Sequence, residues 1–389
     1  AQTRFLAQAP TDQRISLLWR YCSDNHVLNW DSTTTYHFFT AVNYTADSLR
    51  DRRLASYAQY FQRCYRLLLA EDYNPNQSDY RSVLALLART KAWAQAKGYS
   101  DIAASCDHFT GRVYFRLERY GPAFEHLLKA QEAFQEIGYD QVPYAAGYFY
   151  NLGSNYYQFE DFDKALASFL AATRYPFYIS RMEINTFNAI GLIYARQKNW
   201  NKAMVYYRKT IARAAAFHDT VWVGIGAGNL GQAWLAQSQH DSALFYLRCS
   251  YKITSNIANG APEDAAYCTL ALATVFVRQQ QPDSARYYLE SGRQLARGYI
   301  RDAMGNLAFR RRLLPVLVEL NQAAGDYKTA LHFSNSLGTI KDSLQHLWDA
   351  RILSQAANKV EVERYQGELK LLESQKKLTQ LRFYGLVGT

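Results

Sequence analysis

Residues 150–172, YNLGSNYYQFEDFDKALASFLAA, are the stretch that decides the fold, because their spacing recurs at 187–209, FNAIGLIYARQKNWNKAMVYYRK. When the two stretches are aligned on Gly153 and Gly191, each has a tyrosine three residues later. An alanine follows 12 residues after each glycine, and an aromatic residue follows 16 after it. Agreement at several positions over this length indicates an internal repeat.

The same frame recurs around Gly111, Gly231 and Ala273, and a looser sixth copy ends near Leu337. The alanine that opens the second half of each copy can be followed along the chain, at Ala123, Ala165, Ala203, Ala243, Ala285 and Ala330. Two residues before it stand polar residues that we expect to cap the second helix, namely Asp163, Asn201, Asp241 and Asp283.

This pattern resembles the tetratricopeptide (TPR) repeat, in which a helix with small and aromatic residues three apart is followed by a tight turn and a second helix. The resemblance implies an all-α fold, a right-handed superhelical solenoid of antiparallel helix pairs. The repeats here are longer than the usual length of about 34 residues. We therefore expect longer second helices or longer loops between repeats.

Four segments are predicted along the chain. Residues 1–100 are an N-terminal helical cap or degenerate TPR-like helices, and 101–342 are the TPR array of about six repeats. Residues 343–382 contain no proline and are rich in Glu, Lys and Gln, which predicts one long C-terminal helix, either a coiled coil or a helix capping the array. Residues 383–389, FYGLVGT, resemble the start of a truncated transmembrane segment.

The net charge of +10 and pI near 9.2 permit nucleic acid, anionic lipid or an acidic peptide as partner. The short basic run Arg310-Arg311-Arg312 is typical of a solvated helix face, so nucleic acid is disfavoured. The five cysteines form an odd count without a C-x-x-C pair, which signals neither a zinc site nor a disulfide framework. We expect them to be small buried residues.

Gly226, Gly228 and Gly231 show the G-x-G-x-x-G spacing of a dinucleotide-binding turn. That turn needs a preceding strand and an acidic residue about 20 positions later, whereas helices are predicted on both sides and Asp241 comes too soon. We interpret Gly231 as a helix-packing glycine. Since glycine costs about 1 kcal/mol relative to alanine in a helix, we expect Gly224, Gly226 and Gly228 to delay the start of this first helix.

No catalytic, cofactor-binding or metal-binding residue is predicted. The dipeptides His218-Asp219 and His240-Asp241 could suggest a metal-dependent phosphohydrolase, but further ligands at recognisable spacing are missing. The chain is therefore expected not to be an enzyme and to need no cofactor.

In proteins that this chain resembles, ligand contacts come from the inner face of the first helices. Transferring their positions relative to the glycine gives an aromatic, basic and amide-rich set that suits a peptide or protein partner with acidic and apolar features. The set comprises His108, Arg112, Phe115, Arg116, Tyr150, Tyr157, Gln158, Asn185, Asn188, Arg196, Gln232, Tyr267, Thr274 and Arg278. The alternative is that these are ordinary solvated positions without a ligand.

The whole arrangement resembles the extracytoplasmic TPR sensor region of bacterial membrane-bound regulators of the histidine kinase type. This resemblance implies a periplasmic location, signalling and homodimerisation through the C-terminal helix, and a membrane segment beyond residue 389. Lys376 and Lys377 would then lie outside the membrane, against the usual charge bias. The alternatives are a soluble cytoplasmic TPR peptide receptor or scaffold and an extracellular glycan-binding TPR protein.

Overall fold

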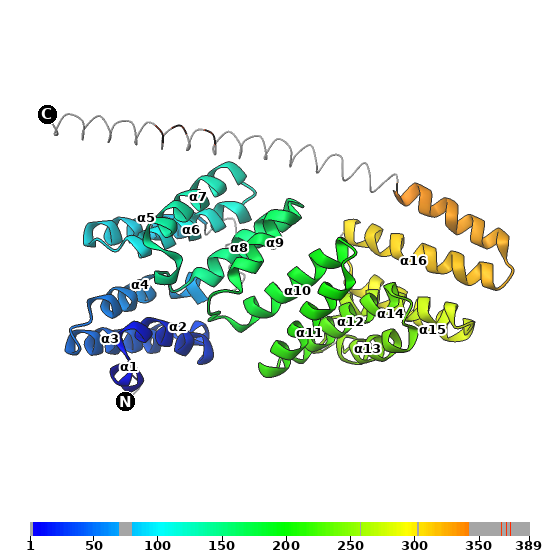
Figure 1. Cartoon of the computed structure of the whole chain (residues 1–389), viewed down its shortest axis with the longest axis horizontal. Coiled ribbons are helices and arrows are strands. Elements are labelled where there is room, and N and C mark those ends of the chain that lie inside the picture. Colours follow the sequence, from blue (N-terminus) through cyan, green and yellow to red (C-terminus); the bar gives the residue numbers. More distant parts are fainter. Residues whose placement is uncertain are drawn as a thin grey trace. The chain divides into compact units, whose positions relative to one another are not determined.

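A computed structural model gives the structure of the chain (Figure 1). The described residues are 3–69, 80–256, 258–301 and 303–341, together with the single positions 367, 371 and 374. Throughout these residues the chain is helical with short connections and contains no β-strand. The all-α fold predicted from the sequence is therefore confirmed. The predicted long helix at 343–382 and the predicted membrane start at 383–389 lie outside the described residues, apart from those single positions.

The chain divides into two compact units after Met182, a boundary that falls in the first turn of α10 (Ser180–Arg196), so most of α10 belongs to the second unit. The helices of the first unit are α1 (Arg4–Gln8), α2 (Arg14–Asp24), α3 (Ser32–Ser48), α4 (Arg52–Leu69), α5 (Tyr80–Lys97), α6 (Ser100–Arg116), α7 (Tyr120–Ile137), α8 (Ala145–Gln158) and α9 (Phe162–Ala172). Those of the second are α10 (Ser180–Arg196), α11 (Trp200–Ala216), α12 (Thr220–Ala236), α13 (His240–Thr254), α14 (Pro262–Arg278), α15 (Pro282–Tyr299) and α16 (Ala303–Ala323). A further helical run covers 327–341.

Consecutive helices pack as pairs, α6 with α7 and α8 with α9 in the first unit, and α12 with α13 and α14 with α15 in the second (Figure 1). The repeat glycine lies where the two helices of a pair cross. A Cβ built on Gly153 would lie 2.8 Å from the ring of Phe169, and one on Gly231 would lie 2.7 Å from Leu247. A side chain added at either glycine would force these neighbours to shift, so the glycine allows the close packing of the pair.

Helix α12 starts at Thr220, at the beginning of its repeat, with the side chain of Asp219 accepting a bond from a backbone amide. The predicted late start caused by its glycines is therefore wrong. A Cβ on Gly224 or Gly226 would lie 2.9 Å from a neighbouring isoleucine, and one on Gly228 would lie 2.7 Å from a serine hydroxyl. The close packing against α11 and α13 offsets the low helix propensity of glycine.

The turn inside each strong repeat contains a non-glycine residue in the left-handed region, with φ between 57° and 59°. These residues are Glu118, Glu160, Lys198, Ser238 and Gln280. The second helix begins directly afterwards, and side-chain caps are made by Asp161 and Asn199, which accept bonds from backbone amides three residues later at 3.2 and 3.3 Å. The predicted capping residues lie two positions too late, inside the first turn, and that prediction is wrong for Asp163, Asn201, Asp241 and Asp283.

The N-terminal helices of the first unit share a core with its repeats. Trp19 of α2 is almost fully buried and stacks on Tyr144 at 5.0 Å between ring centroids, while its edge contacts Phe61 of α4 at 4.7 Å. An ion pair of 2.8 Å between Arg14 and Asp51 joins α2 to the start of α4. Aromatic packing of this kind fixes the N-terminal helices against the start of α8.

All five cysteines are free thiols, and four of them are buried as predicted. Burial raises the pKa of Cys64 to about 11 and that of Cys268 to about 12. Cys249 is exposed, which corrects the prediction for that residue. Among the described helices none is both long and apolar enough to span a membrane.

Gly231→Ala is expected to destabilise the protein by about 1–3 kcal/mol, because the new methyl group overpacks the contact with Leu247. Gly298→Ala in α15 is the matched control, since no atom lies within 4 Å of the added Cβ. This control should stabilise the protein by roughly 0.5–1 kcal/mol through helix propensity. Urea unfolding followed by circular dichroism measures both changes, and equal effects of the two variants would contradict the packing role of Gly231.

Candidate functional site

The first helices of the repeats contact one another as well as their own partners. Helix α6 contacts α8 in the first unit, and α12 contacts α14, which in turn contacts α16, in the second unit. We call the side of these first helices that faces away from the second helices the inner face of each unit. In helical solenoids the small rotation between repeats makes such a face concave.

Side-chain hydrogen bonds connect neighbouring first helices at one register. In the second unit the amide of Asn229 donates to the carbonyl oxygen of Asn188 at 2.8 Å, between α12 and α10. In the first unit the amide nitrogen of Asn151 lies 3.2 Å from Nε2 of His108, between α8 and α6. In both cases the first residue, His108 or Asn188, stands three positions before the glycine of its repeat. Its partner, Asn151 or Asn229, stands two positions before the glycine of the following repeat.

His108 and Phe115 are buried, with 1% and 6% of their surface exposed. Burial, and after it the positive charge of Arg112, lowers the pKa of His108 well below its ordinary value, so the imidazole is neutral. Both residues were predicted to contact a ligand, and the structure places them in the core instead. The reason is that the first helices pack against each other as well as against the second helices, which leaves these two positions no surface.

The other predicted residues of the first unit retain some surface. Arg112 is half-buried with its guanidinium over the ring of Phe109 at 5.4 Å, and Arg116 at the end of α6 is exposed. Tyr150 and Tyr157 of α8 are half-buried, and Gln158 is exposed. These side chains combine two cations, two phenols and an amide on α6 and α8.

In the second unit, Asn185 is half-buried and Asn188 is buried, while Arg196 at the end of α10 is exposed. Gln232 lies half-buried on α12, three residues after the Asn229 that bonds Asn188.

Three predicted residues lie on α14. Tyr267 and Thr274 are half-buried, and Arg278 at the end of the helix is exposed. The hydroxyl of Thr274 donates to the Leu270 carbonyl at 2.8 Å, so its proton is already used inside the helix.

Asp107 forms a buried ion network next to His108. Its carboxylate accepts from Lys91 of α5 at 2.6 Å and lies 2.9 Å from Nδ1 of His126 on α7. Burial acts to raise the pKa of Asp107, but the hydrogen bonds from His126 and Lys91 and the lysine charge outweigh it, so the pKa lies below its ordinary value. The network joins three helices and has the character of a structural ion pair rather than of an acid–base catalyst.

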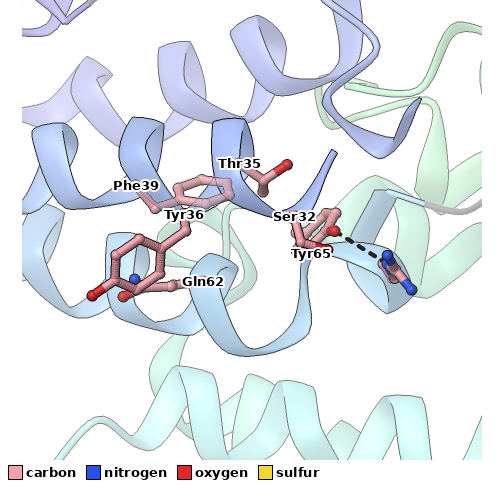
Figure 2. A pocket seen from close by; sticks show the side chains of 7 residues that line it. Ser32, Thr35, Tyr36, Phe39, Gln62 and Tyr65 are labelled. Carbon is pink, nitrogen blue, oxygen red and sulfur yellow. Dashed lines mark hydrogen bonds between the residues drawn. The ribbon is translucent and has the colours of Figure 1, made fainter. Parts of the chain in front are cut away.

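A pocket of about 290 Å³ lies between α3 and α4 (Figure 2). Its lining includes the exposed ring of Tyr36 and the hydroxyl of Tyr65, which accepts a hydrogen bond from Nε of Arg66 at 3.1 Å. No carboxylate, histidine or cysteine lines it. In the described part of the chain no group of three or more His, Cys, Asp or Glu side chains could hold a metal ion.

Three inner-face residues were not in the predicted set, namely Asn151, Asn229 and Arg312. The two asparagines stand two positions before the repeat glycine, an offset outside the transferred ones. Arg312 belongs to the loose sixth copy, where no offset was applied, and its basic run was interpreted as a solvated face. A sequence signal for the asparagines exists, since both precede Leu-Gly in their repeats.

The helix pairs, their crossing glycines and the layer of first helices define a helical repeat protein with a TPR-like fold. The family model described as tetratricopeptide repeat matches residues 146–176. Among curated proteins none matches the sequence significantly.

The structure of the chain is similar to that of RapI in its apo form, with a TM-score of 0.50 and 12% sequence identity over 62% of this chain and 99% of RapI. It is also similar to the apo form of the quorum sensor NprR from B. thuringiensis, with a TM-score of 0.44 and 17% identity over 79% of this chain and 98% of NprR. A Rap protein complexed with Competence and Sporulation Factor gives a TM-score of 0.43 and 15% identity over 81% and 99% of the two chains. The likeness to RapI shows the fold.

Asp107→Asn is expected to destabilise the protein by about 1.5–3 kcal/mol at neutral pH, because the charge-assisted bonds to Lys91 and His126 are lost. Since the folded pKa of Asp107 is lowered, its stabilisation is complete above the ordinary value of 3.8 and is lost as the pH falls through the folded pKa. Urea unfolding of both proteins at pH 7, 5 and 3 should show the difference shrinking only at the lowest pH.

The exposed Asp140→Asn serves as control and should leave the stability within about 0.5 kcal/mol of wild type. A difference between Asp107→Asn and wild type that stays constant down to pH 3 would contradict the lowered pKa.

Proposed function

We propose that this chain is a non-enzymatic receptor domain that binds an extended peptide segment on the inner face of its TPR-like helix pairs. The Asn188–Asn229 hydrogen bond carries the proposal. Each carboxamide has two donors and one acceptor oxygen, so the pair still has donors on Asn188 and an acceptor on Asn229 beyond the bond that joins them. A peptide backbone offers the complementary carbonyl and N–H groups.

The other predicted side chains of the second unit support a peptide better than a sugar or a nucleotide. Gln232 adds another amide on α12, and Tyr267 adds a half-buried aromatic ring on α14. Exposed Arg196 and Arg278 at the helix ends favour acidic features in the partner. Amides bind the backbone in any sequence, while the ring and the cations provide the selectivity.

Two versions of this function differ in how binding is transmitted. In the membrane-bound sensor of the histidine kinase type, binding on the inner face alters the C-terminal helix, a homodimer and a membrane segment. In the peptide receptor that acts by direct contact with a partner, the helix pairs alone are sufficient. We favour the second version, because the helix pairs and the inner-face side chains on which it depends lie within the described residues.

The periplasmic sensor, its homodimer and its membrane segment stay predictions. The gene distinguishes the two versions, because the sensor requires about 20 apolar residues to be encoded after Thr389.

Peptide binding can be tested with a displayed library of random decapeptides selected against the full chain. Asn229→Ala removes the donor to Asn188 and should weaken the selected peptides by about 10-fold or more, the value of one or two lost hydrogen bonds. Fluorescence anisotropy with the labelled peptide measures the change.

Asn201→Ala is the matched control, since Asn201 is exposed on the second helix α11, and it should leave the affinity within twofold of wild type. Circular dichroism establishes that each variant is folded. Failure to select any peptide, or equal weakening by the two variants, would reject the proposed function.

A further inference from the structure

Arg312 of α16 lies against an aromatic ring of α14, the preceding first helix in the second unit. Its guanidinium carbon lies 5.0 Å from the ring centroid of Tyr267 on α14. The same ring makes an edge contact with Phe309, one turn earlier on α16, at 5.7 Å between centroids. Phe309 thus supports the ring of Tyr267, and the ring contacts the guanidinium of Arg312. This contact limits the conformations of the Arg312 side chain, which is exposed to solvent.

Positive charge gathers at this point from two helices. The pKa of Arg312 is lowered by desolvation, and then by the charges of Arg311 beside it and Arg196 of α10, while Tyr267 acts in the opposite direction. No carboxylate of the described residues is among the groups that act on it. The exposure of Arg312 and its desolvation are compatible, because a side chain can reach solvent while protein surrounds its sides.

The N–H groups of a guanidinium held over an aromatic ring lie in the plane of the guanidinium itself, and a carboxylate in that plane can accept two parallel bonds. Arg196 adds long-range attraction to the same anion, and its approach would relieve the repulsion between the arginines. A neutral ligand group would gain neither the charge-assisted bonds to Arg312 nor the attraction to Arg196. The chemistry therefore selects a carboxylate from the peptide over an uncharged side chain.

We propose that Arg312, positioned by Tyr267, is the specificity residue that binds a carboxylate of the peptide ligand, with Arg196 as the supporting charge. This inference rests on the proposed function and specifies its ligand as an acidic peptide. The carboxylate belongs to an Asp or Glu side chain or to the peptide C-terminus.

The experiment selects random decapeptides, displayed with free C-termini, against the wild-type chain, Arg312→Ala and Arg310→Ala. Arg310 is the matched control because it is an exposed arginine two residues away, about 200° around the same helix. Wild type and Arg310→Ala should select peptides with a shared acidic position or a dependence on the free C-terminus. Arg312→Ala should select peptides without either.

The strongest wild-type peptide is then synthesised with each acid changed to its amide and, separately, with an amidated C-terminus. The change that removes the bound carboxylate should weaken binding to wild type by about 10- to 100-fold, and binding to Arg312→Ala by less than threefold. The carboxylate that is bound is therefore the one whose removal weakens binding to wild type but hardly affects binding to Arg312→Ala. Tyr267→Leu should weaken the acidic peptide without affecting its amide variant, because it removes the positioning and not the charge.

Inorganic phosphate at millimolar concentration is added as competitor, and it should displace the acidic peptide only weakly. Strong displacement by phosphate together with no preference for acidic peptides would overturn the proposal in favour of a phosphate ligand. Equal losses for Arg312→Ala and Arg310→Ala would overturn it as a general effect of a basic surface. Selected peptides that depend on Asn229 but not on Arg312 would overturn this inference while leaving the proposed function intact.

Discussion

The close approach of the two helices in each repeat is the constraint on which the structure depends. In three of the repeats the first helix has a glycine where the two helices cross, and the second helix presents Phe169, Tyr207 or Leu247 against it. A methyl group at that point would lie within 3 Å of the opposing side chain. Since interiors are close-packed, the pair can form only with glycine or a similarly small residue there. The turn that joins the two helices of each strong repeat contains a residue with left-handed backbone conformation.

The same constraint positions the polar chemistry. Helices that pack this closely leave the first helices of neighbouring repeats in contact, so the positions just before the small residue face the next repeat. Asn188 and Asn229 in the second unit, and His108 and Asn151 in the first, bond across that contact. Most buried polar groups in folded proteins have a hydrogen-bond partner. These bonds connect neighbouring first helices, and such preorganisation would lower the ordering cost of the peptide binding that we propose.

The sequence predicted the repeat array because the spacing of residues along the chain can be recognised without knowing which helices pack together. The start of α12 was not predicted correctly from the sequence. Helix propensity assigns a cost to glycine but does not include the packing of Gly224 and Gly226 against two flanking helices. The caps were predicted two residues late, since a left-handed non-glycine turn residue leaves little signal in composition. His108 and Phe115 share their offsets with Tyr150 and Tyr157, which are only half-buried, and contacts with adjacent helices decide how much surface each position keeps.

By itself, the sequence determined that the chain is a TPR-like array of helix pairs, where each pair crosses, and which first helices carry amides, aromatic rings and arginines. These features depend on spacing within some twenty residues. Only the tertiary structure decided which of those side chains meet, because Asn188 and Asn229 are 41 positions apart and Tyr267 and Arg312 lie on different helices. The rotation from one repeat to the next sets such distances, and that rotation arises from the packing of whole helices rather than from any local pattern.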